Sequence, residues 1–165
     1  MKEEKNMIRK AVPADEPAIA AVYEKARAFM REHGNPDQWG TQYPPKNLTR
    51  EDIGNGILYV MEEGGKVHGV FMFEIAEDPT YRVIRNGAWK SDAPYGVIHR
   101  VASDGEVHGL MKEAVAFCSG KIRHLRMDTH EKNATMQHQI LRNGFTYCGV
   151  ILTHDGTPRL AYEKV

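Results

Sequence analysis

The stretch "DTHEKNATMQHQILRNGF", residues 128–145, joins the end of a β-type segment to a helix and then to a second β-type segment. Asn133 stands where a short polar side chain can cap a helix, by accepting a hydrogen bond from a free N–H group of the first turn. Met136 and Ile140 recur at helical spacing and predict an apolar face. Gly144 predicts the helix end, because glycine readily takes the left-handed conformation needed there. The stretch therefore predicts a strand, a helix and a further strand.

Apolar periodicity extends this plan in both directions along the chain. Alternating or β-branched runs predict strands, and apolar residues three and four apart predict helices. Gly64-Gly65 separates two strand-type runs and predicts a tight hairpin. The expected strands are 7–12, 58–63, 67–76, 97–102, 122–128, 145–153 and 159–164, and the expected helices are 13–33, a short one in 50–56, 103–118 and 134–142. This order indicates an α/β chain with a central mixed, largely antiparallel sheet and helices on both faces.

Composition excludes several classes of protein. The 165 residues fit one domain, 1–165. Since 22 basic residues balance 22 acidic ones, no net charge steers the chain toward nucleic acid or an anionic membrane. No apolar run is long enough for a membrane span, and the first ten residues lack an apolar signal-peptide core. Cys118 and Cys148 form no Cys-x-x-Cys pair. We therefore expect a cytoplasmic protein with reduced thiols that binds no nucleic acid and no membrane.

Motifs of other enzyme classes are incomplete. "GNGILY" has Tyr59 where a dinucleotide fingerprint needs its third glycine, and "HEKNA" has Ala134 where a zinc-protease helix needs its second His. The eight His residues show no i, i+4 pair on a helix with a third ligand. There is no Gly-x-Ser-x-Gly elbow, and neither Cys lies in a nucleophile context. We expect no metal site, and a His-dependent hydrolase or metalloenzyme is kept as an alternative.

The unit from 97 to 118 is a strand, "VIHRVA", that runs straight into the helix "SDGEVHGLMKEAVAFC" through a small, polar turn. A helix that begins there presents free backbone N–H groups and the positive end of its dipole, which together suit a phosphate or pyrophosphate. Gly109 lets a ligand approach the backbone closely. Ser103 with Glu106 matches a capping box, so the alternative is a turn that only starts a helix.

Together the two strand–turn–helix units resemble the GCN5-related N-acetyltransferase (GNAT) family, and the order of elements matches over essentially the whole chain. That family has an Arg/Gln-x-x-Gly-x-Gly/Ala pyrophosphate loop, followed by the pattern Asn, six residues, Tyr, three residues, Gly-Phe. Asn133, Gly144 and Phe145 keep the second pattern, whereas "EVHGLM" keeps only Gly109 of the first. The resemblance implies a GNAT-like fold with a splayed pair of parallel strands.

The resemblance further implies acetyl-CoA as cosubstrate, without a metal. Glu106 stands where the family has Arg or Gln and would be unfavourable if it pointed at a pyrophosphate. The backbone amides of the loop could still bind, because they do not depend on side-chain identity.

For the rest of the cosubstrate, Asn133 would approach the pantetheine arm, Met136 and Ile140 would form an apolar wall beside the thiol, and main-chain groups near Val101 would pair with the pantetheine amides. Lys132 and Arg142 would meet the adenosine phosphates. The alternatives are that Asn133 only caps its helix and that the two basic residues only face solvent. The expected cofactor-binding residues are Val101, Ala102, Val107, His108, Gly109, Leu110, Met111, Asn133, Met136 and Arg142.

Ile140 occupies the position of the family tyrosine that usually protonates the departing CoA thiolate, so no acid acts from there. A thiol of pKa near 8.5 that leaves as thiolate at pH 7 costs roughly 2 kcal/mol, whereas deprotonating an amine of pKa near 10.4 costs roughly 4.6 kcal/mol. A base is therefore the more valuable group. The candidate bases are Glu74 and His99, on strands that border the expected cleft. Glu74 either faces the other side of the sheet or is a buried carboxylate with a raised pKa, and both residues could be ordinary polar positions of a sheet.

The activity implied is N-acetyl transfer from acetyl-CoA to a primary amine by direct attack in a ternary complex, with a backbone N–H near Val101 stabilising the oxyanion. We expect a small-molecule acceptor, bound beside the loop 33–45 and the loop 78–94; Trp39 and Tyr43 of the first loop would stack on it, or alternatively fill a satellite core. A homodimer, the commonest symmetric assembly, is left open. The alternative, supported by Ile140 and the degenerate "EVHGLM", is a non-catalytic acyl-CoA binding or sensing module.

Overall fold

The protein is built around one seven-stranded sheet with the order β1-β2-β3-β4-β5-β7-β6. The computed structural model describes residues 7–165, so the first six residues of the expected domain lie outside it. Within these residues, β4 and β5 form the one parallel pair and all other neighbours are antiparallel. The strands are β1 (Met7–Lys10), β2 (Leu58–Glu63), β3 (Lys66–Ile75), β4 (Gly96–Ser103), β5 (Leu125–Thr129), β6 (Thr146–Leu152) and β7 (Pro158–Lys164). The predicted mixed, largely antiparallel sheet is confirmed.

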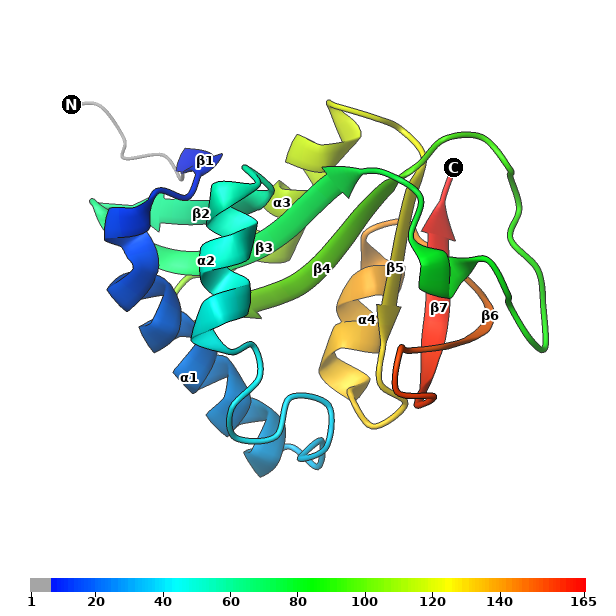
Figure 1. The fold of residues 1–165 in the computed structure, drawn as a ribbon, viewed down its shortest axis with the longest axis horizontal. Helices are drawn as coiled ribbons and strands as arrows, with labels where there is room; N and C mark the ends of the chain where they lie inside the picture. The colour runs from blue at the N-terminus through cyan, green and yellow to red at the C-terminus, as the bar shows by residue number, and fades with distance from the viewer. Residues whose placement is uncertain (1–6) are drawn as a thin grey trace.

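Helices cover both faces of this sheet (Figure 1). The strand alternation sets the two faces, because β3 points Met72 into the core beneath α1 and its neighbour Phe73 into the core beneath α3 and α4. None of the helices within residues 7–165 has the length and apolar character to cross a membrane. The helices are α1 (Glu16–Glu32), α2 (Lys46–Gly54), α3 (Leu110–Ser119) and α4 (Ala134–Arg142), with short 3-10 turns η1 (Pro13–Asp15) and η2 (Pro79–Tyr81).

The parallel pair is short and then opens. β4 and β5 are paired only at Gly96 with Leu125 and at Val97 with Arg126. Further along β4, a bulge against β3 inserts one extra residue, and Arg100 takes φ +51° there. A bulge bends and twists its strand. The two strands consequently diverge toward the bottom of Figure 1, as the predicted splayed pair requires.

The helix predicted directly after Ser103 begins only at Leu110, so the capping box of Ser103 with Glu106 is wrong. Residues 104–109 form a loop in which Gly105 and Gly109 have φ +79° and +81°. A loop held by contacts to β3 replaces the first turns of the expected helix. Local sequence pattern does not report such contacts.

Two other boundaries differ from the prediction. β5 begins at Leu125 rather than 122, because the N–H of Ile122 still bonds the Cys118 carbonyl at the end of α3. α2 begins at Lys46, earlier than expected, since the N–H groups of Leu48 and Thr49 both bond the Pro45 carbonyl. Neither shift alters the fold.

Arg126 of β5 contacts the long connection between β3 and β4 and holds it in place. Its guanidinium carbon lies 4.1 Å from the ring centres of both Trp89 and Tyr95, a cation–π arrangement. Arg126 also donates to the Ser91 carbonyl at 2.6 Å. Through this side chain the connection becomes part of the packed core rather than a free loop.

Glu163 of β7 completes this arrangement as a buried carboxylate, 1% exposed. Its Oε2 accepts a hydrogen bond from Arg126 Nε at 3.0 Å and lies 2.6 Å from His124 Nε2, and its Oε1 accepts from the Lys90 N–H at 2.6 Å. A buried ion is tolerated when its partners are supplied in this way, and removing one partner leaves the other charge uncompensated.

We expect the substitution Glu163→Gln to lower the free energy of unfolding by about 3 kcal/mol, because Arg126 would remain buried without its counter-ion. Glu24→Gln is the matched control, since Glu24 also pairs with an arginine but its side chain is 62% exposed; it should cause no resolvable change. Urea unfolding of the three proteins measures both effects. Equal stabilities of the two variants would contradict the assigned role of Glu163.

Candidate active site

A cleft of about 610 Å³ opens where β4 and β5 separate. Side chains reach it from the loop after α1, the second half of β4, the end of β5, the start of α4 and the β6–β7 hairpin. Four of the residues predicted from sequence line it, namely His99, Val101, Asn133 and Met136. The cleft also contains Trp39 and Tyr43, which the sequence placed beside the acceptor.

His99 is the centre of a polar network on the α1 face of the sheet. Its Nε2 lies 2.7 Å from Asp78 Oδ2, and its Nδ1 lies 3.6 Å from Asp128 Oδ2. The same Asp128 oxygen accepts a hydrogen bond of 2.6 Å from Tyr81. The imidazole therefore stands between two carboxylates, one in hydrogen-bond contact and one slightly beyond it.

Asp78 is held ionised in this network. Burial by itself would raise the pKa of Asp78, but the hydrogen bonds from His99 and Thr80 outweigh it and lower the pKa to about 2. An ionised Asp78 favours a proton on His99 Nε2, which leaves Nδ1 as the lone-pair nitrogen when the ring is neutral. Sequence reasoning found His99 and missed both carboxylates, because Asp78 and Asp128 are brought to it by different elements.

Glu74, the other candidate base, is exposed on β3 and is not among the residues that line the cleft. Of the two alternatives that the sequence left open for Glu74, the buried carboxylate is therefore wrong. Arg142 is likewise exposed at the end of α4, and Lys132 forms an ion pair of 3.3 Å with Asp37.

Asn133 has two contacts that explain its place. Its side-chain oxygen accepts from the Met136 N–H at 3.0 Å, which confirms the predicted helix cap. Its side-chain nitrogen donates to Gln38 at 3.0 Å and so ties α4 to the loop after α1. Met136 faces the cleft from the next turn, whereas Ile140 is fully buried in the core beneath α3 and α4.

The main chain of β4 beyond Val97 has no ladder to β5. Val101 lines the cleft, and the side chain of Ala102 points into the core beneath α1. What this segment presents to the open side is therefore backbone, in the form of an unpaired strand edge. Such an edge accepts an extended ligand as though it were an added strand.

The expected pyrophosphate loop reaches the N-terminus of α3. Glu113 N–H bonds the Gly109 carbonyl as the first bond of this helix, so the N–H groups of Leu110 and Met111 precede the helical ladder. The side chains of Leu110 and Met111 are buried, and His108 is exposed, while Val107 is partly buried against the core. Any anion at this loop would meet backbone amides rather than basic side chains.

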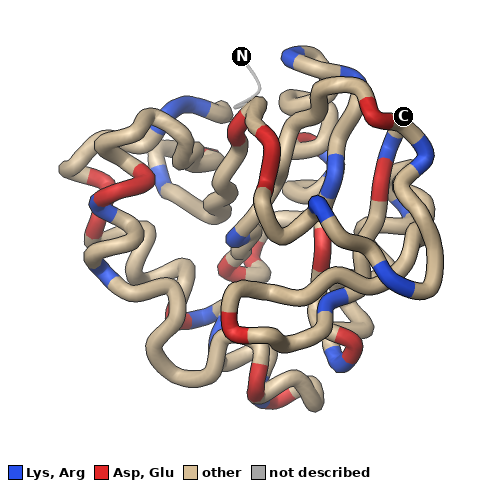
Figure 2. Tube along the Cα trace, turned by 45° about the vertical axis from the view of Figure 1, so that its right-hand side comes forward, with Lys and Arg blue, Asp and Glu red and all other residues tan. Residues whose placement is uncertain are grey.

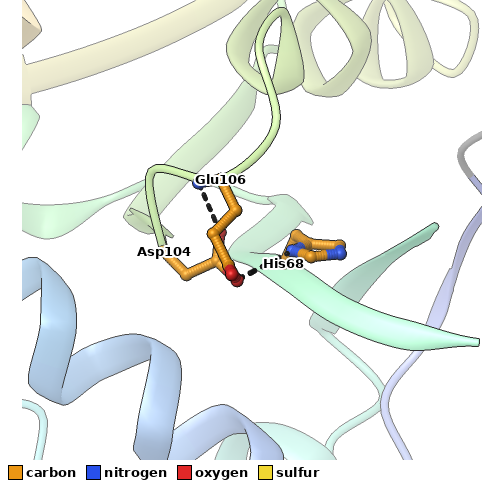
Figure 3. A group of neighbouring side chains, drawn as sticks. All are labelled: His68, Asp104 and Glu106. Carbon is orange, nitrogen blue, oxygen red and sulfur yellow. Dashed lines mark hydrogen bonds and ion pairs between the residues drawn. The ribbon is translucent and has the colours of Figure 1, made fainter. Parts of the chain in front are cut away.

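Three side chains hold this loop against β3 (Figure 3). Asp104 Oδ2 lies 2.7 Å from His68 Nδ1, the Asp104 N–H bonds the His68 carbonyl at 2.9 Å, and Asp104 Oδ1 accepts from the Glu106 N–H at 2.9 Å. Glu106 in turn pairs with Lys66 at 2.8 Å, and this contact lowers the pKa of Glu106 to about 2. The acid that the sequence placed at the pyrophosphate therefore has its own counter-ion.

His68, Asp104 and Glu106 also have the ligand types of a metal site, and their ligand atoms lie within 4.8 Å of one another; this is the one such group that the structure shows within residues 7–165. The His68–Asp104 hydrogen bond and the Lys66 ammonium already occupy these ligand atoms. We therefore interpret the three side chains as contacts that fix the loop 104–109 against β3. The group lies apart from the residues that line the cleft.

Comparisons with known proteins agree with this fold. A GNAT-family acetyltransferase from Streptococcus agalactiae is 33% identical, and the alignment covers 100% of this chain and 98% of that one with a TM-score of 0.86. A GNAT-family acetyltransferase from Listeria monocytogenes is 19% identical over 96% and 94% of the two chains, with a TM-score of 0.69. A Salmonella typhimurium protein solved with its cofactor acetyl-CoA is 16% identical over 97% and 92%, with a TM-score of 0.61. The last two show the fold alone. No protein-family model and no curated protein matches the sequence.

The low pKa of Asp78 predicts a pH-dependent contribution to stability. Because its pKa falls from the usual 3.8 to about 2 on folding, ionised Asp78 stabilises the folded state above about pH 4, and this stabilisation is lost as the pH falls toward 2. We expect the difference in free energy of unfolding between the wild type and Asp78→Asn to shrink over that range. Urea unfolding at a series of pH values measures it. A difference that stays constant down to the lowest pH at which both proteins fold would contradict the assignment.

Proposed function

The chain belongs to the GNAT family of acetyltransferases, and from that premise we propose that it transfers an acetyl group from acetyl-CoA to a primary amine of a small-molecule acceptor. The observation that carries the proposal is the position of the His99–Asp78 pair. It lies in the cleft at the open end of β4 and β5, opposite the start of α4. A base and an unpaired strand edge thus share one opening.

Acetyl-CoA would lie between the separated strands. The amides of residues 107–111 would bind the pyrophosphate, because they precede the ladder of α3 and carry the positive end of its dipole. The pantetheine amides would pair with the main chain around Val101, and Met136 would pack beside the thiol. Asn133 would contact the arm with the side chain that also caps α4. Lys132 and Arg142, both exposed, would meet the adenosine phosphates.

The acceptor amine would enter from the α1 face. Its ammonium form suits the carboxylate of Asp128, and the Nδ1 lone pair of His99 would take the proton that the amine must lose. The neutral nitrogen then attacks the thioester carbon while the main chain near Val101 stabilises the oxyanion, and the second proton that this nitrogen must lose to become an amide passes to solvent. The C–S bond breaks, its electron pair stays on sulfur, and the thiolate takes a proton from solvent. Asp78 orients the imidazole through its contact with Nε2.

Charge and volume support a small cationic acceptor. Four carboxylates, of Asp37, Asp78, Asp128 and Asp155, line the cleft against the two arginines Arg100 and Arg159, and Arg100 is already paired with Asp52. The cleft volume of about 610 Å³ falls in the range of small-molecule sites. Over the described chain, basic residues are scattered among acidic ones (Figure 2), and the formal net charge is zero. This distribution favours no polyanionic partner.

Ile140 supports one other function. Since this position carries no acid and is fully buried, a protein that binds acyl-CoA without turning it over would have the same cleft. Turnover separates the two functions. A cytoplasmic location, a single domain over 1–165, the absence of nucleic-acid, membrane and metal partners, and a homodimer stay predictions.

The proposal is tested by following thiol release from acetyl-CoA with a panel of primary amines. We expect release that depends on the amine, and a His99→Gln variant that is slower by about 100-fold, the size typical of losing a general base. The pH dependence of the rate that the wild type shows should also be absent from the His99→Gln variant.

Glu74→Gln is the matched control, because it removes an exposed carboxylate from the neighbouring strand outside the cleft. It should keep the rate and the pH profile of the wild type. An unchanged rate in His99→Gln would remove His99 from the mechanism, and acetyl-CoA binding without thiol release from any amine would support the non-catalytic module instead.

A further inference from the structure

Thr129, the last residue of β5, has a buried hydroxyl without a hydrogen-bond partner. Four buried side-chain atoms within residues 7–165 share this property, and Thr129 is the one whose residue lines the cleft. The residue is 0% exposed. A buried polar group without a partner destabilises the folded protein, so such a group calls for a reason. The other three atoms belong to Tyr23, Arg27 and Asn35.

The direction of Thr129 follows from the strand alternation. Met127 belongs to the core beneath α3 and α4, so Thr129 two residues later faces the same side and Asp128 the opposite one. The ladder between β4 and β5 has already ended at Arg126. Thr129 therefore lies at the open end, on the side of α4, while Asp128 faces His99 on the side of α1.

The α4 side is where the proposed function places the thiol end of acetyl-CoA. Asn133 and Met136 line this wall, and Ile140 is buried behind it without a polar atom to offer. As the C–S bond breaks, negative charge develops on sulfur, and a fixed donor is most effective where charge develops in the transition state. The Thr129 hydroxyl is such a donor, and no other described side chain occupies it.

We propose that the Thr129 hydroxyl donates a hydrogen bond to the sulfur of acetyl-CoA as it leaves. This inference rests on the proposed acetyltransferase function. Thr129 keeps its proton throughout; the electron pair of the C–S bond remains on sulfur, which is later protonated by solvent. The hydroxyl thus lowers the cost of releasing a thiolate that has no protein acid.

The test uses Thr129→Val, which keeps the shape of the side chain and removes the hydroxyl, and Thr129→Ser, which keeps the hydroxyl. The rate constant of acetyl transfer is measured in a single turnover, the dissociation constant of acetyl-CoA by calorimetry, and the melting temperature without ligand. We expect Thr129→Val to slow transfer by about 10- to 100-fold, the range of a hydrogen bond to a charged group. Its acetyl-CoA affinity should stay unchanged, because the bond strengthens only in the transition state.

The melting temperature distinguishes a role in catalysis from a purely structural role. Thr129→Val should melt at the same or a higher temperature than the wild type, because it removes an unpartnered buried group. Thr129→Ser should retain most of the rate. Thr49→Val is the matched control: Thr49 is also buried, but its hydroxyl contacts the Pro45 carbonyl at 3.4 Å, so this variant should lose stability and keep the rate.

A Thr129→Val protein with the wild-type rate would overturn the inference and leave the proposed function standing. A slower rate matched by an equal loss of acetyl-CoA affinity would also overturn it, since the hydroxyl would then bond to acetyl-CoA already in the ground state. A wild-type protein that does not bind acetyl-CoA would overturn the proposed function, and the inference with it.

Discussion

Two ladder pairs, Gly96 with Leu125 and Val97 with Arg126, are all that join β4 to β5, and the cleft exists because the pairing stops there. A Cβ at Gly96 would lie 2.6 Å from a ring atom of Phe73 on β3 and 3.1 Å from a side-chain carbon of Leu125 on β5, so glycine leaves room there for both side chains. Farther along β4, the bulge at Arg100 bends the strand away. The sheet is thus closed at one end of this pair and open at the other. The unpaired edge of β4 therefore lies inside the sheet rather than at its rim, and an extended ligand can pair with it there.

The same opening collects polar groups from elements far apart in the sequence. β4 supplies His99, β5 supplies Asp128, and the connection before β4 supplies Asp78. That connection is held in place by Arg126 between two aromatic rings and by the buried Glu163. Because the loop that carries Asp78 is fixed by a buried ion pair on the neighbouring strands, the stability of this half of the sheet and the orientation of the imidazole are linked.

The sequence predicts those features that local pattern determines. The start and end of α4 follow from the Asn133 cap and the glycine after Asn143, and the β2–β3 hairpin follows from Gly64-Gly65. Features set by distant contacts were not predictable. Residues 104–109 form a loop rather than a helix because Asp104 is bonded to His68, 36 positions earlier. Asp78 and His99 meet across 21 positions, and the exposure of Glu74 depends on packing. The alternation of residues along a strand predicts which face of the sheet a side chain points to, but it does not predict which element covers that face.

Hydrogen–deuterium exchange with and without saturating acetyl-CoA would show whether the cosubstrate binds at the open strand pair, because it reports on the backbone amides that this pair would offer. We expect slower exchange in residues 100–103 and 105–112 when acetyl-CoA is bound, with β1 and β2 unchanged as an internal reference. Saturating acetyl-CoA that leaves exchange in both segments unaltered would contradict the assignment of this opening as the acetyl-CoA cleft.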